Sequence, residues 1–66
     1  MAKATIKTYK NSEAITLSFN KITPGECLSI YNALFRYSEY SAVAEDVRCY
    51  LKNAAQDHPE LSKHMG

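Results

Sequence analysis

The residues best suited to binding a ligand lie between two predicted helices, in the segment RYSEYS (residues 36–41). Arg36 supplies a positive charge there, and Tyr37 and Tyr40 supply flat aromatic faces on which a base can stack. Ser41 opens the second helix, where backbone N–H groups and the helix dipole favour an anion. These residue types predict a site for a small anionic, nucleotide-like ligand. The alternative is that they only complete the turn and keep its surface hydrated.

Residues that could support catalysis or hold a metal are few and poorly spaced. His58 and His64 flank Glu60 near the C-terminus, but their spacing matches no compact metal signature. Glu45 and Asp46 are neighbours in a predicted helix, so their side chains point about 100° apart and are unsuited to sharing a proton. The sequence also lacks a glycine-rich phosphate loop. We therefore expect no enzyme activity, no metal and no cofactor.

The elements that position these residues begin with two short strands. Residues 5–9 and 14–19 alternate polar and apolar side chains, which is typical of half-buried strands, and Ile15, Leu17 and Phe19 share one face. The polar residues 10–13 between them favour a turn. Residues 1–20 are therefore predicted to form a β-hairpin, whose apolar face must be covered because an isolated hairpin is barely stable in water.

Two helices are predicted for residues 23–56. Thr23 is a suitable N-cap, Pro24 suits the first helical position, and Glu26 completes a capping box. The second helix starts after Ser41 and ends before Pro59, because proline disfavours helical geometry in the preceding residue. Residues 57–66 are predicted to form a polar tail with room for one further helical turn. The fold class is α+β: one domain over residues 1–66, with a β-hairpin followed by an antiparallel helical hairpin.

Helical periodicity assigns opposite faces to the second helix. Its predicted core-facing residues are Val43, Val47, Tyr50, Leu51 and Ala54. Its predicted solvent-facing residues are Glu45, Arg48, Cys49, Lys52, Asn53 and Gln56. From this polar face Arg48 could add a second charge to the ligand site of a neighbouring copy.

The first helix is apolar around an arc of roughly 220°, whereas an ordinary surface helix needs about 100° or more. Two interpretations are open: the hairpin and the second helix together bury that arc, or a second copy or a target protein covers part of it. We favour the second interpretation because a chain of 66 residues has little core to stabilise it. The residues predicted to form the interface of a homo-oligomer are Ile30, Ala33, Leu34 and Tyr37.

The composition is that of a globular protein, with 45% hydrophobic and 23% charged residues and a formal charge of +1. A nearly neutral chain argues against a strongly basic nucleic-acid binder. No apolar run is long enough for a membrane span or signal peptide, so we expect a cytoplasmic protein that does not bind membranes. Cys27 and Cys49 are expected to be free thiols in that compartment.

The order of strand, helix and helix in residues 14–55 is similar to that of ribbon-helix-helix repressors. The resemblance implies a dimer that places outward strand residues in the DNA major groove, here Thr16, Ser18 and Asn20, with Ser41 against a phosphate. The likeness is one of topology, without a specific motif. This chain differs in its predicted first strand, its long first helix and a turn between the helices without glycine.

We expect a non-catalytic, self-associating binding protein. In size the chain resembles the small accessory proteins of phages and mobile elements, many of which act as inhibitors that block a host protein or sequester a small molecule. Its predicted partners are itself and either a host protein or a small anionic, nucleotide-like ligand. A dimeric DNA-binding repressor is the alternative function, and DNA is a partner only under that alternative.

Overall fold

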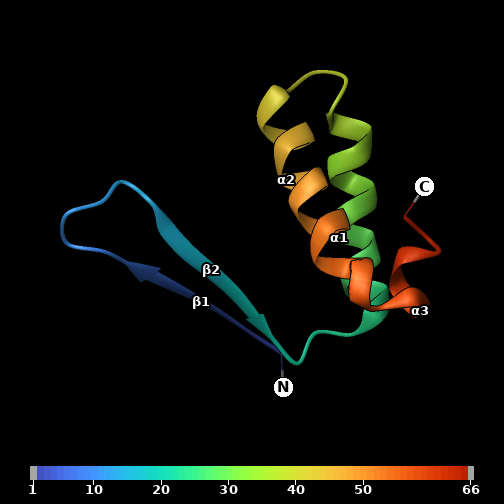
Figure 1. Cartoon of the computed structure of the whole chain (residues 1–66), viewed down its shortest axis with the longest axis horizontal. Helices are drawn as coiled ribbons and strands as arrows, with labels where there is room; N and C mark the ends of the chain where they lie inside the picture. Colours follow the sequence, from blue (N-terminus) through green and yellow to red (C-terminus); the bar gives the residue numbers. More distant parts are fainter. Residues whose placement is uncertain (1, 66) are drawn as a thin grey trace.

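A computed structural model describes residues 2–65. Met1, the first residue of the predicted hairpin segment, and Gly66, the last residue of the predicted tail, lie outside the described residues. The chain forms an antiparallel β-hairpin followed by helices, which confirms the α+β prediction. Figure 1 shows the hairpin extending away from the helices, and α2 folding back along α1. The molecule therefore consists of an arm, residues 2–21, and a helical body, residues 22–65.

The arm is built from β1 (Lys3–Thr8) and β2 (Ile15–Asn20). Residues directly opposite each other in an antiparallel pair have side chains on the same face. Ile6 lies opposite Leu17, and Ala4 lies opposite Phe19, so one face of the arm is apolar. The other face is polar and is formed by Lys3, Thr5, Lys7, Thr16, Ser18 and Asn20.

The junction between arm and body is short. Lys21 has a φ of 59°, a left-handed conformation that costs a residue with a Cβ about 1–2 kcal/mol. Two residues later, Thr23 caps α1 (Pro24–Tyr37) in the predicted capping box. Its hydroxyl accepts a hydrogen bond from the Glu26 N–H, and the Glu26 carboxylate accepts one from the Thr23 N–H. The turn at Lys21 and the capped helix start together set the direction in which the arm leaves the body.

The core lies in the body, on the side of α1 away from the arm. Tyr31 is 1% exposed and packs with Ala55 and Met65. Cys27, Leu28, Leu51 and Leu61 pack around these residues. The last helices, the 3₁₀ helix η1 (Ala55–Asp57) and α3 (Pro59–Ser62), turn the chain back so that Met65 reaches Tyr31. The C-terminal segment, predicted as a polar tail, thus supplies part of the core.

The orientation of α2 (Ala42–Ala54) differs from the helical-periodicity prediction. Ala44 is buried, and Arg48 and Leu51 are half-buried. The predicted core-facing residues Val43, Val47, Tyr50 and Ala54 are instead exposed. Small residues such as Ala44 allow two helices to approach closely, and the long stem of Arg48 can cover apolar surface while its head keeps polar partners. The most apolar face of α2 is therefore left uncovered.

Candidate functional site

The turn between α1 and α2 brings together three of the predicted ligand-binding residues. Arg36, Tyr37 and Tyr40 line an open hollow of about 640 Å³ with Ala33; we call it the turn hollow. The rings of Tyr37 and Tyr40 meet edge to face, with centroids 6.1 Å apart and planes 75° apart. Tyr37 is 54% and Tyr40 81% exposed. The hollow thus has two aromatic side chains and a cation in its lining.

Local hydrogen bonds fix the shape of this turn. The Ser38 hydroxyl donates to the Phe35 carbonyl oxygen, and the Tyr40 N–H donates to the Tyr37 carbonyl oxygen at 2.9 Å. Ser41 is the N-cap of α2, and its hydroxyl accepts a hydrogen bond from the Ala44 N–H at 3.2 Å. Ser41 is half-buried and does not line the turn hollow. Its role in the structure is to start α2 beside the hollow.

Arg36 is the free cation of this site. Its side chain is exposed at the edge of the turn hollow, and it forms no ion pair within residues 2–65. A cation without an internal partner keeps its full charge for a ligand, because no carboxylate competes with an incoming anion. The flat guanidinium can also bind phosphate oxygens through two parallel hydrogen bonds.

Arg48 lies elsewhere, in contact with α1. Its guanidinium pairs with the Glu45 carboxylate and donates to the Tyr31 hydroxyl at 3.0 Å. It also lies 5.3 Å from the centroid of the Phe35 ring, and its side chain is only 14% exposed. The prediction that Arg48 faces solvent is therefore wrong, because the rotation of α2 turns it toward two aromatic rings. Its charge is engaged within its own chain.

The Arg48 guanidinium lowers the pKa of Glu45 to about 2, chiefly through their hydrogen bonds. The pKa in the folded state is thus below the ordinary value of 4.5. Folding therefore favours the charged carboxylate. The resulting stability is complete above about pH 4.5 and is lost as the pH falls toward 2.

We predict that the melting temperature of the wild type falls by several degrees between pH 5 and pH 2, and that Glu45→Gln removes much of this dependence. Circular dichroism melts across this pH range measure the effect. Glu39→Gln is the matched control, because Glu39 is exposed and forms no ion pair within residues 2–65. The same pH slope in Glu45→Gln as in the wild type would contradict the assignment.

The residues predicted to form an interface divide between two hollows. Ala33 and Tyr37 are exposed in the turn hollow. Ile30 and Leu34 are half-buried and line an apolar groove of about 460 Å³ between the arm and the helices; we call it the arm groove. The other residues that line it are Leu17, Phe19, Val47, Tyr50 and Leu51. The broad apolar arc of α1 is therefore partly core and partly open groove.

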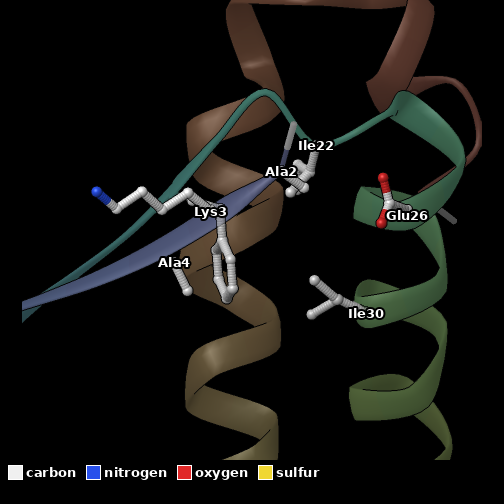
Figure 2. Close-up of a pocket in the computed structure, with 7 residues that line it drawn as sticks. Ala2, Lys3, Ala4, Ile22, Glu26 and Ile30 are labelled. Atoms are coloured by element: carbon white, nitrogen blue, oxygen red, sulfur yellow. The ribbon is translucent and has the colours of Figure 1, made fainter.

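A further hollow, of about 320 Å³, lies where the base of the arm meets α1. Figure 2 shows Ile30 projecting from α1 toward the arm, Ala2 beside Ile22, and the amino end of Lys3 pointing away from the hollow. Phe19 and Ile30 line both this hollow and the arm groove. The open apolar surface thus continues from the base of the arm onto the helices.

The residues assigned to DNA by the ribbon-helix-helix resemblance lie on the polar face of the arm. Thr16, Ser18 and Asn20 share this face with Lys3 and Lys7 of β1. The ribbon-helix-helix resemblance considers only β2 and therefore does not include these two cations. The Thr16 hydroxyl lies 2.6 Å from the Tyr9 hydroxyl, which holds its orientation. β2 pairs with β1 of its own chain, as the sequence predicts.

The histidines and cysteines form no metal cluster. His58 Nδ1 lies 3.8 Å from a Glu60 carboxylate oxygen, and both side chains are exposed. Within residues 2–65, no three His, Cys, Asp or Glu side chains gather where they could bind a metal ion. Cys27 and Cys49 are free thiols. None of the helices described is both long enough and apolar enough to cross a bilayer.

Comparison with known proteins adds no relative: no protein-family model matches the chain, and neither a curated protein nor a solved structure matches it.

Proposed function

We propose that this chain is a non-catalytic, self-associating binding protein that sequesters a small anionic ligand with an aromatic base. The observation that carries the proposal is the turn hollow, an open surface depression that Arg36, Tyr37 and Tyr40 line together. A base stacked on a tyrosine ring gains about 1–3 kcal/mol. Arg36 lines the same hollow as both rings, and its charge matches the phosphate of such a ligand. A nucleotide is the ligand class that combines these two groups.

The turn hollow contains groups that bind rather than groups that react. Its lining consists of Ala33, Arg36, Tyr37 and Tyr40, and contains no histidine, carboxylate or thiol to act as a general base or nucleophile. Sequestration needs only affinity, whereas catalysis needs a positioned acid, base or nucleophile. An inhibitor that holds its ligand is therefore the simplest function for this site. The same exposed surface would serve a protein that blocks a larger partner, and nucleotide binding at the turn hollow would favour sequestration over blocking.

The direct test is calorimetry with ATP, cyclic AMP and cyclic di-GMP. We expect at least one to bind, and Arg36→Ala to weaken that binding about 10-fold to 100-fold, because a hydrogen bond to a charged group contributes about 1.5–3 kcal/mol. Lys63→Ala is the matched control: it removes one exposed cation far from the turn hollow and should leave the affinity unchanged. No binding in this panel, or equal affinity in Arg36→Ala, would contradict the proposal.

A dimeric DNA-binding repressor is the second candidate function. The observation in its favour is the polar face of the arm, where Lys3 and Lys7 lie beside Thr16, Ser18 and Asn20. Contacts to phosphates dominate DNA affinity and make it depend on salt. Binding to duplex DNA that weakens steeply between 50 and 200 mM salt, on the order of 10³-fold or more, would favour this function over sequestration.

A further inference from the structure

We propose that the arm of one copy of this chain lies on the exposed apolar face of α2 in a second copy, and that the exchange is reciprocal. The inference rests on the self-association in the proposed function and specifies its surface. In a two-fold dimer the same two patches meet twice, arm on body and body on arm. The partner's arm would lie along the exposed face of α2, next to the arm groove.

The arm presents an apolar face that its own body does not cover. Ile6 is 65% exposed, and Ile15 and Leu17 are also more than half exposed. β1 and β2 contact chiefly each other, as α1 contacts α2, and Figure 1 shows the tip of the arm far from the helices. A two-stranded hairpin needs its apolar face packed against another element to be stable. The outer half of this arm must obtain that contact from outside its own chain.

The body presents a matching surface. Val43, Val47 and Tyr50 lie at positions i, i+4 and i+7 of α2 and therefore form one apolar stripe. Val43 is 71% exposed, and Tyr50 is also largely exposed. Val47 and Tyr50 already line the arm groove opposite Leu17 and Phe19. The stripe continues beyond the reach of its own arm toward the start of α2.

The exposed area is large enough for a stable dimer. A compact monomer of 7.4 kDa should expose about 4,200 Å², whereas this chain exposes 5491 Å². The excess, about 1,300 Å², is larger than the about 800 Å² that each partner buries in an interface of ordinary size. The radius of gyration agrees: it is 13.0 Å, against about 10.8 Å for a compact chain of this length.

The charges favour contact between arm and body over contact between two arms. The arm carries four lysines and one glutamate, a formal charge of +3, while residues 22–65 carry six acidic and four basic residues, a formal charge of −2. Opposite charges assist association, and like charges oppose it. On α2, Asp46 is exposed and forms no ion pair within residues 2–65. It is available to a lysine of the partner's arm.

Three variants at 50 µM test the proposal by sedimentation. Ile6→Asp places a charge on the apolar face of the arm, and Thr5→Asp places the same charge on the opposite face of the same strand. We expect a dimer for the wild type and Thr5→Asp, and a dimer dissociation constant raised at least 100-fold in Ile6→Asp. Val43→Asp, which changes the body and leaves the arm intact, should dissociate the dimer equally. Undiminished helical circular dichroism would show that the body remains folded.

Cross-linking then identifies which surfaces meet. A carbodiimide joins lysines to carboxylates in an equal mixture of ¹⁴N- and ¹⁵N-labelled protein, so links of mixed label are between chains. We expect mixed links to Asp46 from a lysine at the edge of the docked arm, such as Lys10 in its turn. Mixed links only between arms, for example from Lys7 to Glu13, or a dimer that persists in Ile6→Asp, would overturn this interface and leave self-association standing. A monomeric wild type would contradict both self-association and this interface, whereas the nucleotide titration tests sequestration separately.

Discussion

Replacing Tyr31 with alanine is expected to unfold the helical body at 25 °C. Tyr31 is the largest fully buried side chain among the described residues, and it packs against Ala55 and Met65. Its hydroxyl accepts a hydrogen bond from Arg48, and its ring lies 6.2 Å from that of Phe35. Truncating a buried aromatic residue costs about 3–5 kcal/mol. A core of this size rarely supplies more than about 3–5 kcal/mol, so the loss equals the whole stability.

Circular dichroism at 222 nm, followed through thermal unfolding, measures this effect. Tyr40→Ala is the control, because Tyr40 is 81% exposed and lies outside the core. We expect the control to melt within a few degrees of the wild type and Tyr31→Ala to show no cooperative transition. A cooperative transition in Tyr31→Ala at the temperature of the wild type would mean that Tyr31 does not organise the core.

The second large effect is expected in the C-terminal segment. Met65 is 4% exposed and closes the core over Tyr31. We predict that Met65→Ala lowers the free energy of unfolding by about 2–4 kcal/mol, since methionine-to-alanine substitutions in cores cost about 2–5 kcal/mol and a terminal segment can partly detach. Urea unfolding measures the loss. Lys63→Ala is the control, because Lys63 is exposed in the same segment. It should alter the free energy of unfolding by less than about 0.5 kcal/mol. Equal effects in both variants would contradict the burial of Met65.

The sequence predicts the features that depend on neighbouring residues. Thr23 and Glu26 form their capping box within a single turn, and the alternation in residues 14–19 is sufficient to place β2. The closeness of Arg36, Tyr37 and Tyr40 is predictable for the same reason, because five residues around one helix end cannot separate far. Local signals therefore locate the elements and most of the candidate site.

The features that the sequence does not predict depend on contacts between distant residues. Arg48 turns inward because Tyr31, seventeen positions earlier, offers it an acceptor and a ring face. Helical periodicity treats Arg48 only as a polar residue and therefore predicts the wrong orientation of α2 about its axis. Met65 is likewise placed in a polar tail because its neighbours are polar, although η1 and α3 bring it to Tyr31. One sequence feature could have indicated the burial of Met65: it is an apolar residue that follows a helical turn started by Pro59.

The rotation of α2 also explains the uncovered apolar surface. Once Ala44 and Arg48 face α1, Val43 and Tyr50 must point outward. The arm leaves the body at Lys21 in a direction that carries the tip of the arm away from the helices (Figure 1). The outer half of the arm and the part of the α2 stripe around Val43 therefore stay uncovered within one chain. A second copy can join them without rearranging the core.

The mass of the wild-type protein in solution tests this account most directly. Sedimentation equilibrium between 5 and 200 µM, with native mass spectrometry of the same sample, determines the number of chains in the particle. We predict a dimer, with twice the chain mass of 7.4 kDa, that dissociates only at the lowest concentrations. A single species of 7.4 kDa throughout that range would contradict the account.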